Sequence, residues 1–325
     1  MQAEVIEQKD YGNHVKLTIN KSANRKPILI LAHYDTVWPA GSLRRLPFRI
    51  EDGKAYGPGI FDMKCGLVQG LWALRALLES GNLNSSIVVI SNSDEEIGSP
   101  SSRAIIEGEA KKAECALVLE PSQDGNLKTA RKGTGEFKIR VKGKPAHADL
   151  DPERGVSAIE ELCRLVIELH SMTNFQTGTT LNVGVIRGGT RPNVIAEEAY
   201  AELDLRVMSK NAASRMIPEI MSLRPHNPKV SATVEGGMNR PPMERTKRTE
   251  QLFLLAKRLA LELGYGIGEC SVGGASDGNF CSALGIPVLD GLGAVGDGAH
   301  AAHEHIVVDT IPLRAALVSK LIETI

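Results

Sequence analysis

The segment Pro27-Ile-Leu-Ile-Leu-Ala-His-Tyr-Asp35 decides the fold class of this chain. Its first six residues form a continuous apolar run between a proline and a polar turn, which is typical of a strand buried on both faces. Ser86-Ile-Val-Val-Ile-Ser91 and Cys115-Ala-Leu-Val-Leu119 are two further runs of this kind. Apolar residues recur at helical spacing over Leu67–Leu78, and residues 107–114 fit a helix or a loop. Strands that alternate with helices predict a mostly parallel sheet covered by helices.

The middle of the chain has a different pattern, which indicates a second domain. Residues 136–141 and 199–207 alternate polar and apolar side chains with period two, as half-exposed antiparallel strands do. The other segments of this region are a helix at 155–170, a strand at 179–186, a helix at 211–223 and a strand at 229–234. The α/β pattern then returns with a helix at 249–263 and a strand at 286–289. We therefore predict an α/β domain made of residues 1–131 and 244–325, into which a ferredoxin-like α+β domain of residues 132–243 is inserted.

Metal-binding side chains follow the predicted strands of the α/β domain. His33 comes directly after the first strand, Glu96 lies in Asp94-Glu-Glu-Ile-Gly98 after the second, and Glu120 ends the third. The carboxyl ends of parallel strands are where α/β sheets hold their sites. Two more such side chains are Asp62 in Gly57-Pro-Gly-Ile-Phe-Asp-Met-Lys64 and His300 in Gly298-Ala-His-Ala-Ala-His-Glu304.

Imidazole and carboxylate ligands suit zinc, with cobalt or manganese as alternatives. Two such ions about 3.5–4 Å apart bind a carbonyl oxygen and ionise a water between them. The five residues therefore predict a dinuclear metallohydrolase that acts on an amide bond.

Neighbouring residues are candidates for the chemistry around these ligands. Asp35 shares a face with His33 in an extended segment, so it is the candidate that fixes the imidazole tautomer. Three adjacent carboxylates at residues 94–96 repel one another unless cations neutralise them, although on a surface loop they would be unremarkable. We assign Glu96 to the metal and Glu95 to general-base catalysis. Two alternatives stay open from spacing alone: Asp62 as a helix N-cap, and His303 in place of His300.

Composition excludes several other classes of function. The formal net charge is −1 and aromatic residues make up 4% of the chain, so neither nucleic acid nor an anionic membrane is an expected partner. Five cysteines without a Cys-x-x-Cys pair are typical of free thiols in a reducing compartment. The first residues lack a signal-peptide pattern, and no stretch reaches 18 apolar residues. These features predict a soluble, cytoplasmic protein.

Six motifs together resemble the two-zinc exopeptidase family, which includes glutamate carboxypeptidase (carboxypeptidase G), acetylornithine deacetylase, succinyl-diaminopimelate desuccinylase and aminoacylase. The motifs are Ala32-His-Tyr-Asp35, Gly57-Pro-Gly-Ile-Phe-Asp-Met-Lys64, Asp94-Glu-Glu-Ile-Gly98, Glu120-Pro121, Gly273-Gly-Ala-Ser-Asp277 and Gly298-Ala-His-Ala-Ala-His-Glu304. The resemblance implies a catalytic domain with two Zn²⁺ per chain, in which Asp62 bridges the ions and forms a cis peptide bond with Met63. It also favours His300 over His303.

The resemblance further implies that the inserted domain is a lid that forms a homodimer. His147 in Gly143-Lys-Pro-Ala-His-Ala148 is similar to the histidine that helps to bind the scissile carbonyl or substrate carboxylate, in its own subunit or in the partner's. Asn193 and Arg206 match positions that hold the free carboxylate of a small-molecule or peptide substrate, and Arg240 is a weaker match of the same kind. Family members usually carry further N-terminal elements that cover the catalytic sheet, so we expect the short N-terminus here to expose apolar surface.

Three hypotheses about function follow. Tyr56-Gly-Pro-Gly-Ile60, Asp94-Glu-Glu96 and Arg49-Ile-Glu51 are most similar to glutamate carboxypeptidases, which implies release of a C-terminal amino acid such as glutamate from an N-acyl or peptidyl, folate-like substrate. An N-acyl-amino-acid deacylase, similar to acetylornithine deacetylase or aminoacylase, needs the same site with a different acyl pocket. A zinc-bound binding protein without catalysis is the third, and the complete set of ligands and base argues against it.

Overall fold

A computed structural model describes residues 1–19 and 25–325 of the chain. The chain forms two compact units, of which the first comprises Met1–Arg131 and Met243–Ile325 and the second comprises Lys132–Pro242. Within the described residues, no helix is both long and apolar enough to cross a membrane. All five cysteines are free thiols.

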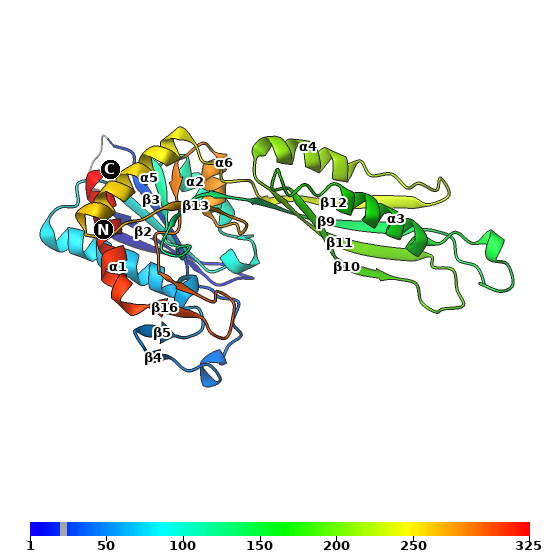
Figure 1. Ribbon diagram of the computed structural model, residues 1–325, viewed down its shortest axis with the longest axis horizontal. Coiled ribbons are helices and arrows are strands. Elements are labelled where there is room, and N and C mark those ends of the chain that lie inside the picture. The colour runs from blue at the N-terminus through cyan, green and yellow to red at the C-terminus, as the bar shows by residue number, and fades with distance from the viewer. Residues whose placement is uncertain (20–24) are drawn as a thin grey trace. The chain divides into compact units, whose positions relative to one another are not determined.

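A six-stranded, mostly parallel sheet forms the centre of the first unit (Figure 1). In spatial order its strands are β1 (Gln2–Ile6), β2 (His14–Ile19), β6 (Ile87–Asn92), β3 (Ile28–His33), β7 (Cys115–Val118) and β14 (Val288–Leu289). β3 pairs in parallel with β6 and β7, and β14 pairs in parallel with β7. β1 and β2 are antiparallel additions at one edge. The predicted α/β class with a mostly parallel sheet is therefore confirmed.

The strands of this sheet carry apolar side chains on both faces, so helices cover both faces. Ile28 and Ile30 of β3 pack into one core with side chains of α1 (Cys65–Ser80), α5 (Lys247–Glu262) and α7 (Ile311–Thr324). Leu29 and Leu31 pack into another core with α2 (Arg103–Ala110) and α6 (Gly278–Ala283). Burial on both faces explains why the strand sequences are continuous apolar runs.

Shorter strands and helical turns complete the first unit, and the sequence patterns did not predict these strands. A small antiparallel sheet has the order β15 (Gly296–Asp297), β16 (His305–Val307), β5 (Lys54–Tyr56) and β4 (Arg49–Glu51). β8 (Leu127–Arg131) pairs in parallel with β13 (Glu269–Val272). Short helical turns are η1 (Ser42–Arg44), η2 (Ile60–Lys64), η3 (Glu95–Ile97) and η5 (Val308–Thr310).

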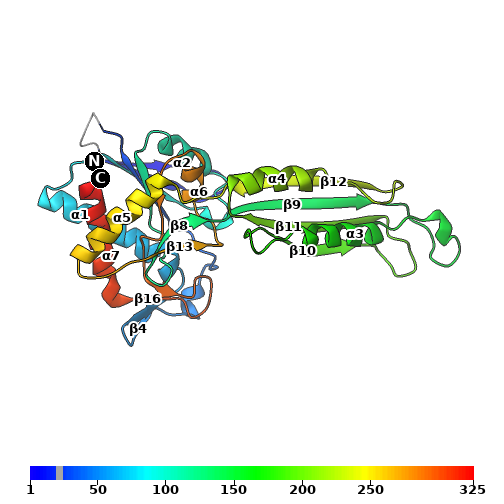
Figure 2. The ribbon, with the colours of Figure 1, turned by 45° about the horizontal axis from the view of Figure 1, so that its top comes forward.

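The second unit is an antiparallel sheet with helices on one face. Its strand order is β10 (Thr180–Gly188), β11 (Glu198–Val207), β9 (Gly133–Lys142) and β12 (Ser231–Arg240). Figure 2 shows α3 (Ala158–Ser171) and α4 (Lys210–Met221) lying along this sheet, while η4 (Pro152–Arg154) lies in a connection. Ser157 and Ser209 directly precede these helices, and their side chains accept backbone hydrogen bonds as N-caps. The apolar half of each alternating strand, such as Phe137, Ile139 and Val141, packs against the helices.

Candidate metal centre

The centre lies where three adjacent strands of the parallel sheet end. His33 is the last residue of β3, Glu95 and Glu96 begin the turn η3 just after β6, and Glu120 follows β7. Because β6, β3 and β7 are neighbours in the sheet, their carboxyl ends bring these side chains together. His33 and Glu120 are buried, with 2% and 7% of their surface exposed.

Asp62 joins two groups of candidate ligands. Its Oδ1 atom lies 3.1 Å from His33 Nε2, which in turn lies 3.5 Å from Glu120 Oε1. Its Oδ2 atom lies 3.4 Å from His300 Nε2, which lies 3.1 Å from Glu96 Oε2. Donor atoms around one tetrahedral zinc ion, at bonds of about 2.0–2.1 Å, are about 3.3 Å apart. The Nε2 atom of His33 lies at about this distance from both Asp62 and Glu120, and that of His300 from both Asp62 and Glu96, so Asp62 belongs to both groups.

The chemistry of this cluster fits cations. Among the described residues, Glu96 Oε1 is buried without a hydrogen-bond partner. Burial, together with the negative charge of Asp62, raises the pKa of Glu96 to about 7. A hydrogen bond to Asp62 raises the pKa of His300 to about 9 against the opposing effect of burial. These carboxylates repel one another, so a bound cation would stabilise the cluster in place of protons.

His33 is oriented by the residue two positions after it. Its Nδ1 atom lies 3.2 Å from the Asp35 carbonyl oxygen and 3.4 Å from Asp35 Oδ1. An Nδ1–H that donates to Asp35 leaves the Nε2 lone pair directed at the cluster. Asp35 Oδ2 also accepts a hydrogen bond of 3.0 Å from the Glu96 backbone N–H, so Asp35 connects the two loops.

Asp62 lies on a loop that Glu304 holds in place. The loop turns at Gly59, which has a φ of 69°, and the Asp62–Met63 peptide bond is cis, as the resemblance implies. The Glu304 carboxylate is 2% exposed and accepts hydrogen bonds from the backbone N–H groups of Gly59, Phe61 and Asp62 at 2.8–3.0 Å. It also accepts one from Trp38 Nε1 at 2.8 Å.

The two remaining predicted residues of this unit differ in position. Glu95 contributes a carboxylate oxygen within 4.8 Å of ligand atoms of His33 and Glu120, and it is half-buried. Among the described residues, His300 contacts Asp62 and Glu96, whereas His303 is exposed and forms no ion pair with this cluster. The geometry thus brings His300 to the cluster and leaves out its competitor.

Three residues at the centre escaped the sequence reasoning. Arg131 is buried and forms a two-bond ion pair with Asp290, at 2.6 and 2.8 Å, and also lies 3.5 Å from Glu120 Oε2. Lys128 is buried on the same strand. Asp290 follows a buried apolar strand, and the same position after a strand identified Glu120, so this signal could have identified Asp290. Nothing in the tract Leu127-Lys-Thr-Ala-Arg131 distinguishes it from a solvated surface segment.

The four predicted substrate residues of the second unit form two separate pairs. His147 bridges to Val194, and the Ala148 N–H donates to the Asn193 carbonyl, so His147 and Asn193 are neighbours. Arg206 on β11 and Arg240 on β12 are both the register partners of Thr134 on β9, which lies between these strands. This second pair is at the opposite end of the sheet from His147 and Asn193.

The distance between the two pairs follows from strand geometry. The Thr134 and Lys142 ends of β9 are about 27 Å apart at the usual rise per residue, and the His147 segment continues beyond Lys142. A single second unit therefore does not bring the four residues together.

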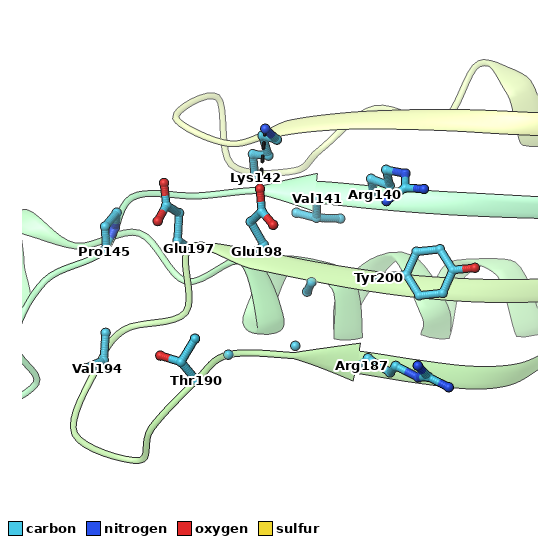
Figure 3. A pocket seen from close by; sticks show the side chains of 13 residues that line it. Arg140, Val141, Lys142, Pro145, Arg187, Thr190, Val194, Glu197, Glu198 and Tyr200 are labelled. Atoms are coloured by element: carbon cyan, nitrogen blue, oxygen red, sulfur yellow. Dashed lines mark ion pairs between the residues drawn. The ribbon is translucent and has the colours of Figure 1, made fainter.

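The open face of the second unit's sheet contains a charged hollow of about 520 Å³. Figure 3 shows Tyr200 between Arg140 and Arg187, and the Arg140 guanidinium lies 5.4 Å from the centre of the Tyr200 ring. Glu198 pairs with Lys142 at 3.4 Å at its rim. None of the predicted site residues lines this hollow.

Comparison with known proteins gives consistent matches over most of the chain. The model of peptidase family M20/M25/M40 matches residues 29–324. Carboxypeptidase G2 from Pseudomonas sp. (strain RS-16) is 32% identical over 310 residues, which cover 93% of this chain and 74% of that protein.

Two solved structures share the fold. Aminopeptidase PepT from Bacillus cereus ATCC 10987 has a TM-score of 0.79 at 24% identity, with 99% of this chain and 88% of that chain covered. The M20 family metallo-carboxypeptidase Sso-CP2 from Sulfolobus solfataricus has a TM-score of 0.73 at 18% identity, with 99% and 90% covered.

Proposed function

The chain belongs to peptidase family M20/M25/M40 and is a metallopeptidase, and we propose that it is a carboxypeptidase that releases a C-terminal amino acid, glutamate above all, from an N-acyl or peptidyl substrate. The observation that carries this proposal is the sharing of Asp62 between the His33–Glu120 group and the His300–Glu96 group. Two ion positions with one common carboxylate suit hydrolysis of an amide. The 32% identity to carboxypeptidase G2 supports the choice of carboxypeptidase over deacylase.

His33, Asp62, Glu96, Glu120 and His300 would hold two metal ions, zinc by the preference of mixed imidazole and carboxylate donors. Bound there, the ions would polarise the scissile carbonyl and make the attacking water acidic. Asp35 keeps the His33 tautomer that leaves Nε2 free, and Glu304 holds the Asp62 loop. The five free thiols support a reducing, cytoplasmic compartment.

Glu95 is the proposed general base and acid. Its carboxylate lies beside His33 and Glu120, and it is not among the residues that form the two Asp62-sharing groups. It accepts a proton from the attacking water as the carbon–oxygen bond forms. It then gives this proton to the leaving nitrogen as the carbon–nitrogen bond breaks, so that the products are a carboxylic acid and a free amino acid.

Binding of the substrate's free carboxylate is proposed for Asn193, Arg206 and Arg240. His147 is proposed to help bind the scissile carbonyl or that carboxylate. Because the two pairs lie at opposite ends of the second unit's sheet, one small substrate cannot contact all four residues of one chain. This separation supports a homodimer in which His147 and Asn193 act in the partner's site. β10 supports the same interface, since it is an edge strand with Ile186 51% exposed.

The test uses metal-reconstituted protein with a panel of N-aroyl-glutamate, N-acetyl-ornithine, succinyl-diaminopimelate and dipeptides. We expect release of glutamate to be preferred. Replacing Glu95 by Gln should lower turnover by about 10²–10⁴-fold with the metal content unchanged. Glu79→Gln, which alters an exposed ion pair with Arg75, is the matched control.

The outcomes of this test separate the hypotheses. Retained activity in Glu95→Gln would remove Glu95 as the base. Preference for a small acyl group on a basic amino acid would assign the chain to the deacylases. Metal binding without hydrolysis of any substrate in the panel would support the binding-protein hypothesis instead.

A further inference from the structure

Lys64 ends the motif that contains Asp62, but it is neither a candidate ligand nor the proposed general base. It is the N-cap residue of α1, where its positive charge opposes the helix dipole. Its side chain is exposed, and its ammonium group donates a hydrogen bond of 3.0 Å to the Tyr34 carbonyl. Among the described residues, this is the only hydrogen bond of the ammonium group, which forms no ion pair. A cation that is unfavourable for the helix and binds one carbonyl points to a role at that carbonyl.

The carbonyl that Lys64 binds lies between two residues of the centre. Tyr34 joins His33 to Asp35 in the chain. Asp35 in turn orients the His33 imidazole and accepts the Glu96 backbone N–H at 3.0 Å. A shift of Tyr34 would therefore move His33 directly and Glu96 through Asp35.

A second contact joins the same two segments of the chain. His33 lies past the paired part of β7, and its N–H donates to the Met63 sulfur at 3.3 Å. Met63 and Lys64 directly follow Asp62 in the sequence. Two successive side chains after Asp62 thus bind the backbone of two successive residues, His33 and Tyr34.

The Asp62 loop also packs against the segment that follows β3. A Cβ added to Gly59 would lie 3.3 Å from Lys64 Nζ and would overlap the Thr36 side chain. The Gly59 carbonyl accepts the Lys64 backbone N–H at 3.0 Å, so the loop closes on itself at the lysine. The Lys64 side chain therefore connects two segments that already lie against each other.

We propose that Lys64 is a positioning residue that holds the His33–Asp35 segment against the Asp62 loop, so that the candidate ligands are already spaced for metal ions in the metal-free protein. This inference rests on the metal centre of the proposed function. Residues that hold metal ligands in place change metal affinity by about 10–100-fold when they are replaced. The charge of Lys64 alone predicts the opposite sign, because loss of a positive charge near cations strengthens their binding. The direction of the change therefore separates positioning from charge.

The test measures the affinity of metal-free protein for Zn²⁺, and separately for Co²⁺, by competition with a chromophoric chelator at one pH. Lys64→Met removes the donor and the charge, and we expect it to bind metal about tenfold more weakly. Lys64→Arg keeps both and should bind within about threefold of the unmodified protein. Lys111→Met, which removes an exposed lysine elsewhere in the same unit, should change nothing.

The absorption spectrum of bound Co²⁺ gives a readout that a general loss of stability does not move. This spectrum depends on the geometry of the ligands, so at saturating Co²⁺ it should differ in Lys64→Met and be restored in Lys64→Arg. Because Lys64 is exposed, the thermal midpoint of metal-free Lys64→Met should fall by no more than about 4 °C.

Three results would overturn the inference. They are unchanged metal affinity in Lys64→Met, tighter binding, which would leave Lys64 an effect of charge alone, and equal weakening in Lys64→Met and Lys64→Arg. If the unmodified protein binds metal and hydrolyses no amide, only the proposed function fails, and the affinities still decide the role of Lys64. If it binds no metal, the centre and this inference fail together.

Discussion

At the scale of single residues, protons and metal ions compete for the same atoms. Burial and the charge of Asp62 raise the pKa of Glu96 to about 7, and the hydrogen bond to Asp62 raises that of His300 to about 9. Both groups must lose their protons before they bind a metal ion, so affinity rises with pH. We expect the logarithm of metal affinity at this half of the centre to rise by about one per pH unit above pH 7, where His300 alone is protonated, and by about two below it.

A competition titration with a chromophoric chelator from pH 5.5 to 8.5 measures this slope. Glu96→Gln should bind the metal more weakly, and its slope below pH 7 should fall by about one because one titrating group is gone. A metal affinity that does not change with pH in the unmodified protein would show that these side chains are not the ligands.

Some residues of the centre could be predicted from the sequence and others could not. His33, Glu96 and Glu120 were predictable because each follows a recognisable buried strand. Lys128 and Arg131 were not, since Leu127-Lys-Thr-Ala-Arg131 has the composition of a surface strand. Their burial depends on Asp290 and on the cluster around Glu120, which are brought to β8 by the fold and not by the local sequence.

At the scale of elements, one carboxylate joins three loops. Glu304 accepts three backbone N–H groups of the Asp62 loop and the indole N–H of Trp38. Glu304→Ala would leave these buried donors without an acceptor, so we expect the free energy of unfolding of the metal-free protein to fall by about 3–5 kcal/mol. Urea denaturation measures this loss. Trp38→Phe removes a single bond and should cost about 1 kcal/mol; equal stability of Glu304→Ala and the unmodified protein would refute this role of Glu304.

Strand length decides which elements the sequence predicts. The long apolar runs of β3, β6 and β7 made these strands predictable, because burial on both faces leaves a pattern within each strand. Strands of two or three residues, such as β15 and β16, carry no periodicity, and they form through partners that lie far along the chain. The contact of Glu304 with Asp62 spans more than two hundred residues, so no local sequence pattern predicts it.

At the scale of the whole molecule, the proposed homodimer makes a prediction that a monomeric enzyme does not. If His147 acts in the partner's site, a Glu95→Gln subunit still supplies an intact His147, and a His147→Ala subunit still supplies an intact Glu95. Each variant alone should be inactive or nearly so. Mixing equal amounts under conditions that exchange subunits should restore about a quarter of the unmodified activity, because half of the dimers are mixed and each has one complete site.

The matched control for this mixture is Glu95→Gln with Glu96→Ala, since both changes lie in the first unit and no mixed dimer gains a complete site. If His147 acts within its own subunit, the first mixture stays as inactive as the control. A mixture that remains inactive while sedimentation shows dimers would therefore move His147 to its own site, and one that remains inactive with only monomers present would remove the dimer itself. The exposed Ile186 on β10 and Ile167 on α3 provide apolar surface for such an interface, whose formation would also protect the unpaired edge of the sheet.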